Sequence, residues 1–133
     1  GKLCACGRTG CVEAYASGPN MVALAKDLGW QGTSDSFIEV AAAARLGDAF
    51  ALQAIESGSK ALAVGLVNFV GSLDIGHIVI GGGVAQAGDI YWNPLMKHIR
   101  AESEYYGFLR NLKVSPAKLT TDAGLIGAAL GVL

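Results

Sequence analysis

The chain has 133 residues, of which 52% are hydrophobic and 16% charged, and its formal net charge is −1. This length suits one domain with a buried core, and the composition excludes a disordered polyelectrolyte. The low net charge gives no electrostatic footprint for nucleic acid, and the longest apolar run, residues 61–73, is shorter than a membrane span.

The first distinctive segment is LCACGRTGCVEAY, residues 3–15, which holds all three cysteines, Cys4, Cys6 and Cys11. One residue separates Cys4 from Cys6, so a disulfide framework is a poor account, and a reducing, cytoplasmic setting with bound metal fits better. Zn²⁺ accepts three thiolates and one more ligand in a tetrahedron, and the glycines of the segment allow tight turns.

Neither histidine of the chain is placed beside these cysteines by sequence, since His77 borders an expected strand and His98 lies inside an expected helix. A fourth metal ligand upstream of residue 1 is therefore favoured. The chain starts in mid-motif, without an initiator methionine or the apolar centre of a signal peptide, so we expect a fragment of a longer protein. Arg8 is expected to face solvent.

Short helices are expected next. The segment CVEAYAS has helical spacing, and residues 17–29 form an amphipathic helix with Pro19 in its first turn and Gly29 at its end. Residues 36–47 begin with a capping box, in which Ser36 is followed three positions later by Glu39.

The longest helical pattern runs over residues 48–73, and its second half is apolar nearly all round, which predicts burial on most sides. A short β-branched strand, HIVI, then leads into three glycines. A helix starting near Asn93, a strand in NLKVSPA and a helix capped by Thr121 or Asp122 complete the chain. The order predicts one α/β domain over residues 1–133, with a small sheet covered by helices.

Three motifs carry a family resemblance. CACGRTGCVEAYAS resembles the C-x-C-G-x-x-G-C-x-E signature of the ROK family (repressors, open reading frames and sugar kinases), and IVIGGGV and DAGLIGAAL resemble its later glycine-rich segments in order and spacing. The resemblance covers essentially the whole chain. It implies the C-terminal lobe of an actin-like, hexokinase-like (ribonuclease H-like) ATPase fold.

The resemblance also implies site residues. Cys4, Cys6 and Cys11 would bind a structural zinc in a loop over residues 1–13, together with a histidine that lies upstream of this sequence. Glu13 would accept hydrogen bonds from sugar hydroxyls, the alternative being a solvated glutamate at a helix start. Gly81, Gly82 and Gly83 would form the nucleotide loop, the alternative being a tight turn.

The function implied is transfer of a phosphoryl group from ATP, with Mg²⁺, to a hexose hydroxyl, as in a glucokinase. The D-x-G-x-T loop and the catalytic aspartate of the family are absent from the sequence, so no catalytic residue is assigned and the chain alone is expected to be inactive. A homodimer through the long helix is expected. Two alternatives remain: the sugar-sensing part of a ROK transcriptional repressor, with nucleic acid as a partner only if a winged helix precedes it, and a helix-rich scaffold.

Overall fold

The computed structural model describes residues 1–119 and 122–131. Its elements in chain order are α1 (Glu13–Ala16), α2 (Gly18–Leu28), α3 (Phe37–Arg45), α4 (Ala49–Leu73), β1 (His77–Ile80), the 3₁₀ helix η1 (Val84–Ala87), α5 (Asp89–Ser103), the 3₁₀ helix η2 (Gly107–Leu109), β2 (Lys113–Pro116) and α6 (Ala123–Leu130). The α/β architecture with one small sheet confirms the predicted fold class.

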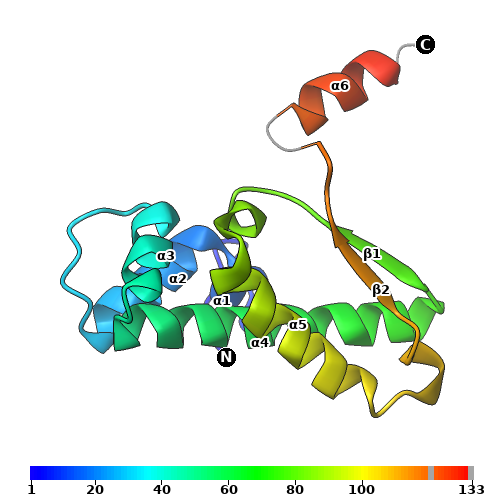
Figure 1. Cartoon of the computed structure of the whole chain (residues 1–133), viewed down its shortest axis with the longest axis horizontal. Helices are drawn as coiled ribbons and strands as arrows, with labels where there is room; N and C mark the ends of the chain where they lie inside the picture. Colours follow the sequence, from blue (N-terminus) through cyan, green and yellow to red (C-terminus); the bar gives the residue numbers. More distant parts are fainter. Residues whose placement is uncertain (120–121, 132–133) are drawn as a thin grey trace.

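The long helix α4 organises the molecule (Figure 1). Helices α2 and α3 pack on its first half, α1 packs near its middle, and α5 packs along it. Buried side chains from these helices, among them Met21, Val40, Ile55 and Leu95, form the core. The fold therefore rests mainly on helix packing, with the sheet at one end of α4.

The predicted helix starts are confirmed by side-chain caps. Ser17 accepts a hydrogen bond from the backbone N–H of Asn20 at 3.4 Å, and Asp48 accepts one from Ala51 at 2.8 Å. Each cap satisfies a backbone donor that the first turn leaves free. Gly29 ends α2 with φ of 121°, a conformation that favours glycine.

The capping box of α3 is only half formed. Ser36 accepts from the Ile38 N–H at 3.3 Å, as an N-cap should, but the Ser36 N–H donates to the hydroxyl of Ser34 at 3.0 Å. Ser34 thus takes the place that the box assigns to the Glu39 side chain. Its hydroxyl is two residues away and reaches the donor without ordering a long side chain.

The two predicted strands pair in parallel, with His77 opposite Lys113 and Ile80 opposite Pro116. Helix α5 makes the crossover between them, as parallel strands require. Ile78, Ile80 and Val114 pack toward the core, whereas Val79 on the other face of the sheet is 59% exposed.

Helix α5 begins at Asp89, four positions before the predicted start near Asn93, so Pro94 lies inside it. Tyr91 and Leu95, one turn apart, are both buried in the core. Burial of these side chains on one helix face outweighs the hydrogen bond that Pro94 cannot donate.

The second half of α4 is less buried than predicted. Phe69 and Leu73, one turn apart, are 61% and 56% exposed, so one apolar face of the helix stays open in this chain. The sequence pattern alone could not show which faces find partners, because periodicity reports hydrophobicity and not contact.

The last helix, α6, stands apart from the other elements in Figure 1. Asp122 occupies its N-cap position but makes no side-chain cap hydrogen bond, and Thr121 lies outside the described residues. Within residues 1–119 and 122–131, no helix has the length and apolar character needed to cross a bilayer.

Candidate functional site

The cysteine loop is a compact turn at the start of the chain. The Cys4 N–H donates to the Arg8 carbonyl at 2.8 Å, and the Cys4 carbonyl accepts from the Gly7 N–H at 2.9 Å. Gly7 and Gly10 have φ of 84° and 79°, the left-handed region in which side chains are strained. Glycine at these two positions therefore lets the loop fold back, as the sequence predicts.

The loop brings the three thiols together. The sulfur atoms of Cys4, Cys6 and Cys11 all lie within 4.8 Å of one another, and those of Cys6 and Cys11 are 3.6 Å apart. Thiolates on one tetrahedral zinc, with Zn–S bonds of about 2.3 Å, stand roughly 3.8 Å apart. The spacing fits three of the four ligands of such a site, and the donors are the soft type that zinc prefers.

Arg8 controls the charge of this cluster. Hydrogen bonds from its backbone and its side chain, with a smaller contribution from Cys11, lower the pKa of the Cys6 thiol to about 7. The contact with Cys6, followed by burial, raises the pKa of Cys11 to about 11. Near neutral pH, Cys6 therefore gives up its proton more readily than Cys11 does. Arg8 is exposed, as predicted, but the sequence does not reveal its effect on the pKa of Cys6.

Both histidines have other partners. The Nε2 atom of His77 is 2.9 Å from the Ser115 hydroxyl, and that of His98 is 2.8 Å from the Glu56 carboxylate. Among the residues that the structure describes, no histidine joins the three cysteines. This agrees with the expectation that neither histidine lies beside them.

Glu13 is the first residue of α1, two positions after Cys11. Its carbonyl accepts a hydrogen bond from the Asn20 side chain at 3.0 Å, which ties α1 to the start of α2. Its side chain is exposed and makes no ion pair or hydrogen bond within the described ranges. The carboxylate is therefore free to receive a ligand, and its sugar-binding role stays a prediction.

The triple-glycine loop follows β1. Gly82 has φ of 98°, a left-handed conformation in which a side chain is strained, and a Cβ on Gly81 would lie 3.1 Å from the Ala117 Cβ and crowd it. Gly81 and Gly82 line a small hollow of about 120 Å³ together with Pro116 and Ala117. The loop is followed by a four-residue 3₁₀ turn, η1, and the α-helix starts at Asp89.

A larger hollow of about 570 Å³ lies beside Gly83, the last glycine of the loop. Gly83 and Val84 form one wall, and Phe37 and Ile38 from the start of α3 form another. Gly18 completes it, and a Cβ on Gly18 would lie 3.3 Å from the Phe37 Cβ, so a larger residue would crowd Phe37. The sequence did not predict this hollow, since its walls come from segments that lie far apart along the chain.

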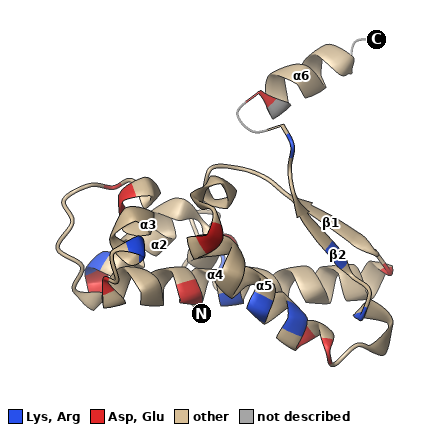
Figure 2. Ribbon diagram, in the orientation of Figure 1, with Lys and Arg blue, Asp and Glu red and all other residues tan. Residues whose placement is uncertain are grey.

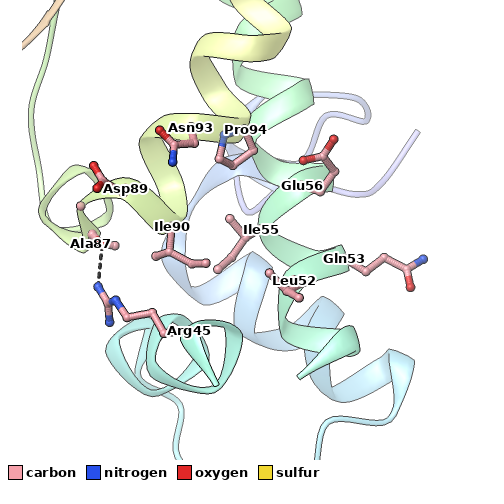
Figure 3. A pocket seen from close by; sticks show the side chains of 11 residues that line it. Arg45, Leu52, Gln53, Ile55, Glu56, Ala87, Asp89, Ile90, Asn93 and Pro94 are labelled. Atoms are coloured by element: carbon pink, nitrogen blue, oxygen red, sulfur yellow. Dashed lines mark hydrogen bonds between the residues drawn. The ribbon is translucent and has the colours of Figure 1, made fainter. Parts of the chain in front are cut away.

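A third hollow, of about 870 Å³, lies between α3, α4 and α5 (Figure 3). Leu52, Ile55 and Ile90 give it an apolar floor, and polar side chains such as Asp89 stand around its rim. The Arg45 guanidinium donates to the Ala87 carbonyl, which fixes α3 to η1. Arg45 lines both this hollow and the one beside Gly83, so it stands at their border.

Comparisons with known proteins agree on one family. The ROK family model matches residues 1–133. The chain is 38% identical over 132 residues to the N-acetylmannosamine kinase of Haemophilus influenzae (strain PittEE), covering 99% of this chain and 41% of that protein. It is 32% identical over 143 residues to the glucokinase of Halalkalibacterium halodurans, covering 96% of this chain and 42% of that protein.

Solved structures give the same result. A ROK family glucokinase from Streptomyces griseus, in complex with glucose and AMPPNP, matches 97% of this chain with 46% of its own, at a TM-score of 0.81 and 30% identity. A ROK hexokinase from Thermus thermophilus matches 98% of this chain with 43% of its own, at a TM-score of 0.84 and 30% identity. A ROK family transcriptional regulator, a homologue of the E. coli MLC protein, matches 98% of this chain with 35% of its own, at a TM-score of 0.75 and 26% identity. The chain spans less than half the length of each of these proteins.

Proposed function

Because the chain belongs to the ROK family and has the fold of one lobe of its sugar kinases, we propose that it is part of an ATP-dependent kinase that phosphorylates a hexose or an N-acetylhexosamine. The triple-glycine loop beside the 570 Å³ hollow is the observation that carries this proposal. The N-acetylmannosamine kinase and glucokinase relatives support it.

The nucleotide would bind across the triple-glycine loop. The apolar walls of Phe37, Ile38 and Val84 suit the flat faces of a purine base. Gly81 and Gly82, which carry no side chains, leave the backbone of the loop open to a phosphate or a ribose. Mg²⁺ bound with the phosphates would neutralise their charge during transfer.

This assignment predicts opposite results for two valine substitutions. A Cβ on Gly83 or Gly76 meets no heavy atom within 4 Å, and neither residue is left-handed, so both variants should fold. Gly83→Val should weaken binding of Mg-AMPPNP about tenfold or more, roughly 1.4 kcal/mol, because it fills space beside the hollow. Gly76→Val should bind as the unmodified chain does. Calorimetric titration measures both, and equal affinities would contradict the assignment.

Sugar would be held near Glu13, and the metal loop would hold that region in place. We propose a structural zinc bound by Cys4, Cys6 and Cys11, since their sulfurs have the required spacing. Such a metal would order the loop directly before α1 and thus fix the position of the Glu13 backbone at the start of that helix. Thiolate ligands need reducing conditions, which supports a cytoplasmic location.

A transcriptional regulator remains the second candidate, because a regulator of the same family shares the fold at 26% identity. Assays of the full polypeptide that carries residues 1–133 distinguish the kinase from the regulator. ATP-dependent phosphorylation of glucose, mannose, fructose or an N-acetylated hexosamine supports the kinase. Sugar binding without turnover, together with a basic winged helix that binds DNA, supports the regulator.

We also propose that the protein is a homodimer, with the open apolar face of α4 in the interface. Phe69 and Leu73 on that face are exposed, and residues 61–73 carry no charge that would need water (Figure 2). Exposed apolar faces of this kind are typical of protein interfaces.

A further inference from the structure

Cys6 and Cys11 have the arrangement of an oxidisable pair of thiols. Their sulfur atoms are 3.6 Å apart, Cys6 is exposed and Cys11 is partly exposed. A disulfide joins sulfurs about 2.05 Å apart, so a small approach is enough to close it. We propose that a hydroperoxide converts Cys6 and Cys11 into an intramolecular disulfide, and that this modification releases the metal from the loop.

The third thiol is poorly placed for such a bond. Cys4 is only 6% exposed, so an oxidant in solution reaches it last. Its backbone N–H and carbonyl are both hydrogen-bonded, to Arg8 and Gly7, which holds its position. A bridge to Cys6 would also have to close a ring with one intervening residue, for which the geometry is strained.

The loop between Cys6 and Cys11 has room to move. Gly7 and Gly10 lie inside it, and no heavy atom stands within 4 Å of the place where a Cβ would lie on either. Gly10 is held by the hydrogen bond that its N–H donates to the Lys2 carbonyl at 2.9 Å, so the approach of the two sulfurs would come from the Cys6 side, where Gly7 has open space.

The reaction has two steps that balance. The Cys6 sulfur attacks the terminal oxygen of the hydroperoxide, the O–O bond breaks, and a sulfenic acid and an alcohol form, or water if the oxidant is hydrogen peroxide. The Cys11 sulfur then attacks the Cys6 sulfur, an S–S bond forms and water leaves. The two thiols supply the two electrons that reduce the peroxide, and their two protons end in the alcohol and the water.

Metal release follows from the ligand count and rests on the metal site proposed above. The disulfide removes two of the three thiolates and leaves Cys4 alone, too few to hold zinc in a tetrahedral site. Oxidation would then loosen the loop before α1, and a thiol reductant would restore it.

The experiment treats the full chain with equimolar hydrogen peroxide in a metal-free and a zinc-loaded sample. Intact mass should fall by about 2 Da in both, the loss of two hydrogens, and peptide mapping should place the bond between Cys6 and Cys11. The loaded sample should release its zinc in step with this loss, as read with a metal-sensitive dye, and dithiothreitol should reverse both changes.

Two variants make the test specific. Cys4→Ser keeps the pair and should still lose about 2 Da, whereas Cys11→Ser should instead gain oxygen on Cys6. A bond that includes Cys4, a bond between two chains, or oxygen gained by the unmodified chain would overturn the proposal. So would a disulfide that forms while zinc stays bound. If the chain takes up no zinc, the metal site fails, and the metal-free sample still decides the disulfide.

Discussion

Each thiol of the cysteine loop lies in a different environment although the three sit within eight positions of one another. Cys4 is buried, whereas Cys6 is exposed beside Arg8. A buried ligand anchors a metal to the body of the fold, and an exposed one leaves the site open on one side. The loop therefore has an anchored ligand, Cys4, and an accessible one, Cys6.

Replacing one thiol should empty the site. Cys4→Ser removes the buried ligand, and zinc per chain after dialysis should fall roughly tenfold, because the two remaining thiolates hold the ion too weakly. Leu3→Ser is the matched control: Leu3 is 73% exposed and adjacent, and the variant keeps all three thiols. Elemental analysis measures both. Full retention of zinc in Cys4→Ser would contradict the assignment of this ligand.

Glu13 offers an equally sharp test because α3 holds a matched glutamate. Glu13 and Glu39 are both exposed and lie in the first turn of a helix. Glu13→Gln should raise KM for the sugar about tenfold or more, since a hydrogen bond to a charged group contributes about 1.5–3 kcal/mol. Glu39→Gln should leave KM unchanged. Kinetics on the full polypeptide give the values, and equal KM values in the two variants would return Glu13 to a merely structural role.

At the scale of elements, α4 shows why glycine can be required inside a helix. A Cβ on Gly58 would lie 2.4 Å from the Met21 sulfur and 3.1 Å from the Tyr15 carbonyl oxygen. One on Gly65 would lie 2.6 Å from a methyl carbon of Val12. Seven positions apart, the two glycines share one face of the helix and let α1 and α2 approach closely.

Alanine substitutions of two glycines in α4 should therefore change the free energy of unfolding in opposite directions. Gly58→Ala should lower the free energy of unfolding by about 1–3 kcal/mol through overpacking. Gly71→Ala, where a Cβ would only touch Leu109 at 3.6 Å, should raise it by about 0.5–1 kcal/mol through better helix propensity. Denaturant titrations measure both. Stabilisation by Gly58→Ala would show that the close approach is not needed.

On the scale of the whole molecule, apolar surface is left open at one end. The exposed face of α4 lies near Tyr106, because the Tyr106 hydroxyl donates a hydrogen bond to the Asn68 side chain of α4 at 3.3 Å. The rings of Tyr106 and Phe108 meet edge to face, with their centroids 5.9 Å apart. A cluster of exposed aromatic and aliphatic side chains is the usual centre of an interface. The proposed dimer would cover this end.

Sedimentation velocity tests that dimer. Phe69→Glu puts a charge into the proposed interface and should give a monomer at concentrations at which the unmodified chain is a dimer, because a buried unpaired charge is costly. Leu46→Glu changes a leucine that is 91% exposed away from this face and should leave the dimer intact. A dimer that survives Phe69→Glu places the interface elsewhere.

The sequence by itself determined the features that depend on neighbours along the chain. The helix starts near residues 17 and 48, the two short strands and the turn that gathers the cysteines were all predicted, because hydrogen bonds and φ preferences act over a few residues. The family resemblance rested on such local motifs too, and the match over residues 1–133 confirms it.

Only the tertiary structure decided what depends on contact between distant segments. It placed Phe37 opposite Gly83, started α5 at Asp89 because Tyr91 and Leu95 enter the core, and left Phe69 exposed. It also brought the Arg8 side chain to Cys6. The reason is physical: periodicity shows which side chains can be buried, whereas burial and pockets are fixed by which helix faces meet.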